Sequence, residues 1–318
     1  MKIEIVFNCK QGEIIAGKSA FEWMKEGLEA LAGTPSLYRL TVNEAMPLLD
    51  DAFIIKTIGT MNKRGLDGAI LGGGKLERKY VKDGKYVELS SVECATFEPS
   101  TSIEIIERLY LRKALKLKEE GVRIVSAESV FIEGSVSIGK GSVVYPFTRI
   151  SGNTVIGENC EIGCFCEIED SIVEDGSIIT SSQIKRSKVG KNTRVGPYAY
   201  LRDGADVGDG CRIGDYVEIK ASKVSDGVKA AHHAYIGDAF VGKRTNVGCG
   251  SVFCNYDGKE KRSITVGSDV FIGGNVNLIA PLVVGDNSYI AAGSTVTKDL
   301  EENSFVIARE RETIKKRK

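Results

Sequence analysis

The stretch Phe131–Ile162, FIEGSVSIGKGSVVYPFTRISGNTVIGENCEI, carries an aliphatic residue at every sixth position. These residues are Ile132, Ile138, Val144, Ile150, Ile156 and Ile162. The stride continues to Ile168 and resumes over Val189–Ile219 and Val266–Val296. A helix would repeat near 3.6 residues and an ordinary strand at two, so a period of six fits neither. The period indicates short strands, each with one inward aliphatic residue stacked on the coil above.

Three such strides make one triangular coil of about 18 residues, with glycine, Asn or Asp at corners where φ is positive. The predicted fold is therefore mainly β, a parallel β-helix. Its left-handed sense is implied by resemblance to hexapeptide-repeat proteins. Two interruptions are expected where the stride fails, at Val224–Tyr235 and at the polar segment Asn255–Ser263. Departures from a regular solenoid often carry function.

The segments that flank the solenoid have other patterns. Ser102–Gly121 carries an apolar stripe at helical spacing and predicts a connector helix that ends at Gly121. Residues 1–100 predict a small α/β domain, with strands at Ile3–Phe7, near Ala69–Leu71 and near Tyr86–Val92, and a helix at about Ala20–Leu31. The predicted domains are 1–100, the connector 101–121, the β-helix 122–302 and a basic tail 303–318.

Composition excludes several classes of protein. The 318 residues hold 43 Lys and Arg against 43 Asp and Glu, and this zero balance disfavours a nucleic-acid binder. No apolar run reaches the ~18 residues of a membrane helix, and the N-terminus turns polar too early for a signal peptide. We therefore expect a cytoplasmic protein with reduced thiols. The cluster Cys160, Cys164, Cys166 lacks zinc spacing, and packing explains it better, so no metal site is predicted.

Two glycine-rich motifs occur in the first hundred residues. Gly12–Ser19, GEIIAGKS, matches the phosphate-binding pattern G-x4-G-K-[ST]. Its bulky interior, and the alternative that Ser19 caps the next helix with Glu22, argue against that function. The run Leu71–Lys75, LGGGK, is more typical of a loose turn.

The two histidines of the chain, His232 and His233, are adjacent within the first predicted interruption. Arg202 and Lys220 are 18 residues apart, so they are expected to stack on the same side of the solenoid. Further polar residues lie within about two coils of His232. They are Tyr235, Asn246, Asn255, Tyr256 and Lys261. Cations beside a titratable base suit an anionic substrate from which a proton is removed.

From Val195 to Arg309 the chain resembles the acetyltransferase domain of the bifunctional bacterial N-acetylglucosamine-1-phosphate uridyltransferase / glucosamine-1-phosphate N-acetyltransferase family. The similar segments are TRVGPYAYLRDGADVG, IGDYVEIKAS, KAAHHAYIGDA, NVGCGSVFCNYDGKEK, VFIGGNVNLIAPLVVG and YIAAGSTVTKDL. The preceding coils and the connector helix resemble the same family, so the likeness covers roughly residues 102–309. The uridyltransferase opening motif is missing, and residues 1–100 do not resemble that domain.

The resemblance implies a role for each matching residue. His232 would be the general base in acetyl transfer from acetyl-CoA to the 2-amine of glucosamine-1-phosphate, a precursor for the cell wall. Arg202, Lys220 and Lys261 would hold the sugar phosphate, Tyr235 and Asn246 the sugar hydroxyls, and Asn255 and Tyr256 would lie beside the substrate and thioester. The acetyl-CoA groove would be formed by Cys249, Gly274, Ala292 and Arg309. The resemblance also implies a homotrimer with active sites between subunits.

Other functions stay open at this point. The acceptor could be another amino sugar or a nucleotide-linked amino sugar. The chain could also be a non-catalytic scaffold, although such a scaffold has no need of the His232 set. A γ-type carbonic anhydrase shares the solenoid, but it needs three zinc-binding histidines from separate coils, which two adjacent histidines cannot supply. The departures from the family are Gly274, His233 and Ala234.

Overall fold

The computed structural model describes residues 4–7, 14–15, 18–28, 38–42, 46, 49, 51–64, 68–71, 74–78, 86–88 and 102–314. The chain divides into two compact units, which we treat separately. The first contains residues 1–114 and 132–135, and the second contains residues 115–131 and 136–318. None of the helices in the described residues is long and apolar enough to cross a membrane.

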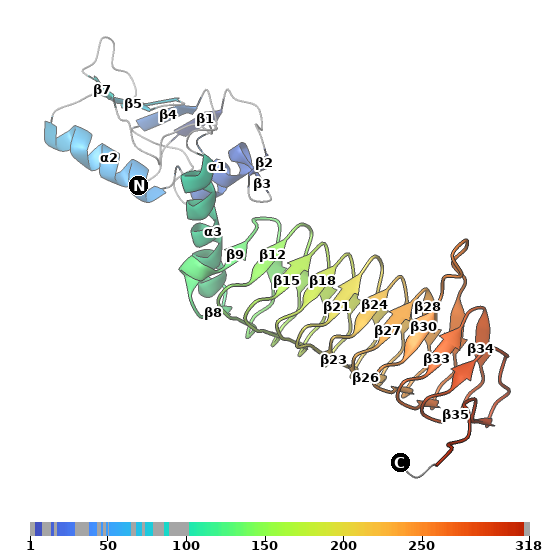
Figure 1. The fold of residues 1–318 in the computed structure, drawn as a ribbon. Helices are drawn as coiled ribbons and strands as arrows, with labels where there is room; N and C mark the ends of the chain where they lie inside the picture. The colour runs from blue at the N-terminus through green and yellow to red at the C-terminus, as the bar shows by residue number, and fades with distance from the viewer. Residues whose placement is uncertain are drawn as a thin grey trace, which may run out of the picture. The chain divides into compact units, whose positions relative to one another are not determined.

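The second unit is a solenoid of stacked coils with three parallel sheets, one for each side of the triangle (Figure 1). We call these sheets face 1, face 2 and face 3, in the order in which the chain visits them. Successive strands of a face lie one coil apart, as in Ser137↔Val155, Val143↔Glu161 and Arg149↔Glu167. The predicted parallel β-helix is confirmed.

Each face is built from strands of two to four residues. Face 1 contains β8 (Arg123–Ile124), β11 (Val143–Val144), β14 (Glu161–Ile162), β17 (Ile178–Ile179), β20 (Arg194–Val195), β23 (Arg212–Asp215), β26 (Lys229–His232), β29 (Asn246–Val247), β32 (Phe271–Ile272), β35 (Tyr289–Ile290) and β37 (Phe305–Val306). Face 2 contains β9 (Phe131–Ile132), β12 (Arg149–Ser151), β15 (Glu167–Glu169), β18 (Gln183–Lys185), β21 (Tyr200–Arg202), β24 (Glu218–Lys220), β27 (Tyr235–Gly237), β30 (Val252–Cys254), β33 (Asn277–Ile279) and β36 (Thr295–Val296). Face 3 contains β10 (Ser137–Ile138), β13 (Val155–Ile156), β16 (Ile172–Val173), β19 (Lys188–Val189), β22 (Asp206–Val207), β25 (Lys223–Val224), β28 (Ala239–Val241), β31 (Ile264–Val266) and β34 (Leu282–Val284). A short 3-10 helix, η2 (Ala127–Ser129), precedes β9, and β37 extends face 1 beyond the predicted end of the solenoid at residue 302.

The inward residue of each stride forms the core, as predicted. Ile162, Ile213 and Ile290, for example, are fully buried on face 1. A second column lies at the corners, where buried hydroxyl groups bond to the neighbouring coil: Ser142 Oγ donates to Gly157 O at 2.8 Å and accepts from Cys160 N at 2.9 Å. Cys160 occupies the next slot of that column, which agrees with a packing role for the cysteines.

One of the two predicted interruptions is wrong. Through Val224–Tyr235 the coils continue without a break, because Ala230 takes the inward slot between Ile213 and Val247 and is fully buried. The coil is only shortened, to the 17-residue offset of Lys229↔Asn246. The prediction failed because alanine is not one of the large aliphatic residues that mark the six-residue period, although the backbone of the coil is unchanged.

The second interruption is confirmed. β30 ends at Cys254 and β31 begins at Ile264, and the residues between them leave the solenoid as an outgrowth (Figure 1). Tyr256 and Lys261 pair across it as an antiparallel bridge. Asp257 caps its tip, where its Oδ1 accepts from the backbone N–H groups of Lys259 and Glu260, both at 2.8 Å.

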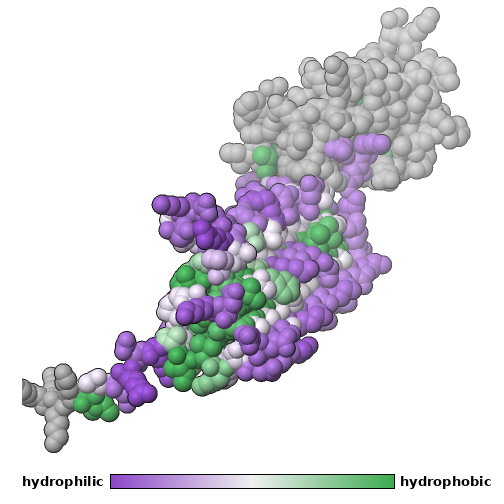
Figure 2. Space-filling model, turned by 90° about the vertical axis from the view of Figure 1, so that its right-hand side faces the viewer, coloured by the Kyte–Doolittle hydropathy of each residue, from purple (hydrophilic) through white to green (hydrophobic). Residues whose placement is uncertain are grey.

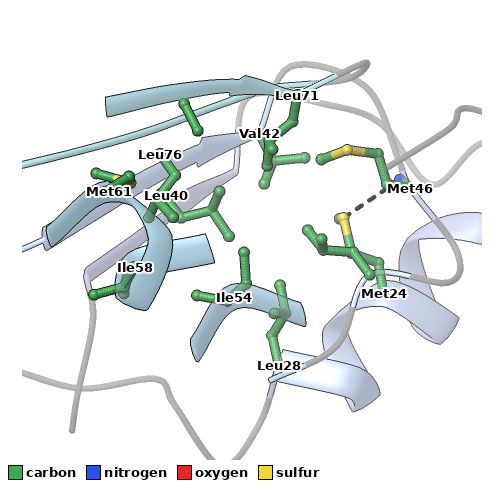
Figure 3. Close-up of a cluster of buried hydrophobic side chains, with 12 residues drawn as sticks. Met24, Leu28, Leu40, Val42, Met46, Ile54, Ile58, Met61, Leu71 and Leu76 are labelled. Atoms are coloured by element: carbon green, nitrogen blue, oxygen red, sulfur yellow. Dashed lines mark hydrogen bonds between the residues drawn. The ribbon is translucent and has the colours of Figure 1, made fainter. Parts of the chain in front are cut away.

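The first unit is the predicted small α/β arrangement. Its elements are β1 (Glu4–Phe7), β2 (Ile14–Ile15), β3 (Lys18–Ser19), α1 (Ala20–Leu28), β4 (Tyr38–Val42), α2 (Asp51–Arg64), β5 (Gly68–Leu71), β6 (Gly74–Arg78) and β7 (Tyr86–Glu88). The five-stranded sheet has the order β1-β4-β6-β5-β7. Side chains such as Leu40, Leu76 and Ile54 pack between this sheet and the two helices (Figure 3). The helix α3 (Ser102–Glu119) follows at the position of the predicted connector.

The described residues of both glycine-rich motifs lie in antiparallel strand pairs. In GEIIAGKS, β2 and β3 pair antiparallel as Ile14↔Ser19 and Ile15↔Lys18, and α1 begins directly afterwards at Ala20. Lys18 and Ser19 therefore belong to a strand, which differs from a loop that wraps phosphates with free N–H groups. In LGGGK, Leu71 is the last residue of β5 and pairs antiparallel with Gly74, the first residue of β6. Gly12, Gly17, Gly72 and Gly73 lie outside the described residues.

The stacked core generates a test of stability. Ile213→Ala should lower the free energy of unfolding by about 2–5 kcal/mol, because the lost side chain leaves a cavity between coils. Its matched control is Arg212→Ala, the exposed outward neighbour on the same strand, which should change stability by less than about 0.5 kcal/mol. Chemical denaturation followed by circular dichroism measures both. Equal losses in the two variants would contradict the inward stacking of Ile213.

Candidate functional site

The corner between face 1 and face 2, here called corner A, brings together the predicted base and the predicted acetyl-CoA residues. Asp215 and His232 end β23 and β26 and pair in register. On the following coils, equivalent positions of this corner are joined by backbone hydrogen bonds. Gly250 N donates to His233 O, Asn275 N to Cys249 O and Gly293 N to Gly274 O, at 2.7–2.8 Å. His232, Cys249, Gly274, Ala292 and Arg309 therefore follow one another on successive coils.

The far part of corner A has small side chains. A Cβ added to Gly274 would lie 3.3 Å from Cys249 O, so even this atom would press on the neighbouring backbone. Ala292 adds only a methyl group, and Arg309 crosses it to donate from Nη1 to Ala292 O at 2.6 Å. Cys249 is exposed. Ala292 is exposed as well, and Gly274 is half-buried.

His232 is accessible and partnered. Its side chain is 54% exposed, and Nδ1 lies 2.6 Å from Oδ1 of Asp215. The hydrogen bond from His232 holds the pKa of the Asp215 carboxyl group below its usual value. His233 lies beside them, with its ring 4.8 Å from that of Tyr216 and Nε2 4.0 Å from Oδ2 of Asp215. Sequence analysis missed Asp215; the only available signal was its place 17 residues before His232, one coil away.

The corner between face 2 and face 3, here called corner B, holds the predicted phosphate-binding cations. Arg202 and Lys220 end β21 and β24 and pair in register. Both already face carboxylates. Arg202 donates to Glu218 Oε1 at 2.8 Å and to Asp203 Oδ2 at 2.7 Å. The Lys220 ammonium lies 4.0 Å from Oδ2 of Asp238.

The outgrowth begins on the same column as corner B. Asn255, its first residue, is buried and donates through Nδ2 to the Asp238 carboxylate. Lys220, Asp238 and Asn255 therefore form a chain of contacts from the solenoid into the outgrowth. Lys261 and the exposed Tyr256 face each other across the outgrowth.

Two predicted sugar-binding residues lie on different sides of corner A. Tyr235 begins β27 on face 2, and its ring extends over Gly237, where an added Cβ would strike the phenol oxygen. Asn246 begins β29 on face 1, in register between Lys229 and Phe271. Within one chain, the predicted acceptor residues are therefore spread over both faces, corner B and the outgrowth.

The cysteine cluster has no metal-site geometry. No group of three His, Cys, Asp or Glu side chains that could hold a metal ion occurs in the described part of the chain. Cys160 and Cys166 are buried, and burial raises the pKa of the Cys166 thiol to about 11. Cys160 Sγ contacts Glu174 O at 3.2 Å. These thiols serve as small, weakly donating side chains in the hydroxyl column.

Family comparisons match two parts of this solenoid. Residues 263–298 match the family described as bacterial transferase hexapeptide (six repeats), and residues 126–208 match the GMPPB C-terminal domain. The solenoid is a hexapeptide-repeat domain. Both matches lie within the stacked coils that contain corners A and B.

Curated relatives confirm the resemblance to the bifunctional family. The chain is 45% identical over 207 residues to "Bifunctional protein GlmU" of Carboxydothermus hydrogenoformans, covering 65% of this chain and 46% of that protein. The protein of the same name from Clostridioides difficile is 41% identical over 281 residues, covering 86% and 58%. The chain thus spans about half the length of the relatives it matches. The second match also extends to residues before 102, so the predicted lack of likeness there stays a prediction.

A solved structure, the Francisella novicida UDP-N-acetylglucosamine acyltransferase, is 18% identical with a TM-score of 0.40, covering 55% of this chain and 63% of that one. This similarity is too low to support a conclusion about activity.

Proposed function

We propose that this hexapeptide-repeat protein is an acetyl-CoA-dependent N-acetyltransferase that acts on glucosamine-1-phosphate or a closely related amino sugar. Relatives that share 40–47% identity support an acyltransferase. The observation that carries the proposal is corner A, where His232 shares one column with Cys249, Gly274, Ala292 and Arg309. A base beside a column of small residues suits attack by an amine on a thioester held along that column.

The proposed transfer needs one proton acceptor and one anchor. His232 would take the proton as the sugar amine forms its bond to the acetyl carbon and the bond from that carbon to the CoA sulfur breaks. An imidazole is suited to this because its unprotonated ring nitrogen can accept the proton directly. Arg309, at the far end of the column, would bind CoA phosphates.

The acceptor would approach from face 2. Tyr235 lies on that face between corner A and corner B, so an acceptor whose amine meets His232 extends toward Arg202 and Lys220. Since Glu218 and Asp203 already bind Arg202, a phosphate dianion has to compete with two carboxylates. This observation favours the second candidate, an amino sugar without a 1-phosphate, strongly enough to include it in the assay.

We also propose that the active enzyme is a homotrimer. The spread of Asn246, Tyr235 and Lys261 over different sides of one chain supports sites shared between subunits. Corner A supports this as well, because it exposes an aromatic ridge in which Phe147 stacks on Phe165 at 5.4 Å and Tyr198 on Tyr216 at 5.5 Å. Figure 2 shows hydrophobic residues gathered on part of an otherwise hydrophilic surface of the solenoid. Exposed apolar groups in a row are typical of association surfaces.

The first test of the proposal is acetyl transfer itself. Purified protein with acetyl-CoA should release CoA, measured by chromatography, with glucosamine-1-phosphate, with glucosamine, or with both. His232→Ala should lose roughly 10²–10⁴-fold in rate, because it removes the base. His233→Ala is the matched control and should retain most of the rate. Absence of CoA release with every amino sugar tested would exclude the function; a His232→Ala rate within about twofold of wild type would exclude the base.

The exposed thiol of Cys249 tests the cosubstrate groove. Iodoacetamide should alkylate the exposed Cys249 quickly and Cys166 slowly, because thiolate is the reactive form and burial both shields the Cys166 thiol and raises its pKa. Saturating acetyl-CoA should slow alkylation of Cys249, located by peptide mass mapping, and leave alkylation of the partly exposed Cys164 unchanged. Unchanged alkylation of Cys249 at saturating acetyl-CoA would place the cosubstrate elsewhere.

The aromatic ridge tests the assembly. Phe165 is 67% exposed, and Phe165→Ser should convert a trimer into smaller species, measured as mass by sedimentation. Phe240→Ser is the control, because Phe240 is 41% exposed on face 3, opposite corner A. A wild-type protein of monomeric mass would contradict the assembly, and a trimeric Phe165→Ser variant would remove the ridge from its interface.

A further inference from the structure

We propose that Asp215 is a positioning residue that fixes the ring orientation and the tautomer of His232. The catalytic consequence of this pair rests on the proposed acetyl transfer, but the pair itself rests only on the geometry of corner A.

The backbone holds the two residues in place before their side chains meet. Asp215 and His232 are the last residues of adjacent strands and pair in register. Directly beyond them, His233 N donates to Asp215 O at 2.8 Å. On the other side, Gly214 lies so close to Ala231 O that no Cβ would fit there. Contacts on both sides of the pair therefore fix the separation of the two side chains.

The side chains then form a directed hydrogen bond. Oδ1 of Asp215 lies 2.6 Å from Nδ1 of His232, a distance typical of charge-assisted bonds. An ionised carboxylate can only accept, so Nδ1 carries a proton, and in the neutral ring Nε2 then keeps its lone pair. That tautomer is the one that can remove a proton through Nε2. Without Asp215, the ring could rotate and either nitrogen could be protonated.

The carboxylate would act through the histidine and not on the substrate. As the amine proton moves to Nε2, the imidazole becomes an imidazolium, and the adjacent negative charge stabilises it. The proton stays on the histidine until the CoA thiolate takes it, so Asp215 is not itself protonated. The second carboxylate oxygen faces His233, whose Nε2 is 4.0 Å away and whose ring packs on Tyr216.

Asp215→Asn tests the inference, because it keeps the shape of the side chain and removes its charge. The amide can donate to Nδ1 as well as accept from it, so it no longer selects one tautomer. We expect kcat to fall roughly 10–100-fold, as for other groups that orient a functional histidine, with KM for both substrates nearly unchanged. Asp215→Glu should recover part of the loss. The matched control is Asp269→Asn, at an exposed aspartate that binds Arg244 at 2.5 and 2.7 Å away from both corners.

A spectroscopic measurement separates positioning from a merely structural role. The chain has two histidines, so nitrogen-15 NMR of labelled protein, assigned with His233→Ala, can report the tautomer of His232. Wild type should show protonated Nδ1, and Asp215→Asn should show a mixture of tautomers with an unchanged thermal midpoint. The same tautomer in both proteins, or a kcat within about twofold of wild type, would overturn the inference.

The two proposals can fail separately. If wild-type protein transfers no acetyl group to any amino sugar, the proposed function fails, while the nitrogen shifts still decide whether Asp215 sets the tautomer. If Asp215→Asn unfolds, Asp215→Ala, which also removes the charge, gives the same comparison.

Discussion

The hydrogen bonding of each coil to the next is the constraint on which this structure depends. In the solenoid, each strand pairs in parallel with the strand one coil away, and backbone contacts at the corners do the same, as in Gly250 N to His233 O at 2.8 Å. Because the backbone register is fixed, residues 16–18 positions apart are brought to neighbouring places on one face or corner. Inward-facing residues of successive coils therefore stack into a hydrophobic column, and buried hydroxyl groups at the corners stack into a second column. At corner A, the stacked residues are the candidate functional groups.

The register has a further consequence for electrostatics. Charged residues on neighbouring coils lie close together, so two ion pairs form beside corner B, Arg202 with Glu218 and Lys220 with Asp238. Exposed ion pairs of this kind contribute little to stability, on the order of 0–1 kcal/mol each. Their larger effect is on binding, because an incoming anion must displace a carboxylate from Arg202. The outgrowth is joined to this network through Asn255, so binding at corner B can affect the outgrowth.

The sequence predicted the solenoid well and the first unit only in part. The six-residue stride identifies the inward residues one by one, because each coil buries the same position. In the first unit, β4, α2 and β6 were not predicted, because their residues show no hydrophobic periodicity that would have indicated a strand or a helix. The interpretation of Val224–Tyr235 as an interruption was wrong for a related reason. Ala230 does not belong to the pattern of large aliphatic residues, yet its side chain occupies the inward position of the coil.

By itself the sequence determined the period, and through it the three faces, the buried columns and the place where the chain must leave the solenoid, because a six-residue stride can bury its aliphatic residues only in stacked coils. The sequence also indicated His232 as the candidate base. Only the tertiary structure decided which polar residues share a column. Coil lengths vary from 18 residues to 17 and to 25 at the outgrowth, as in Asn246↔Phe271, so counting along the chain cannot place a residue on a corner. For this reason Asp215 emerged as the partner of His232, and Asn246 and Tyr235 came to lie on different faces.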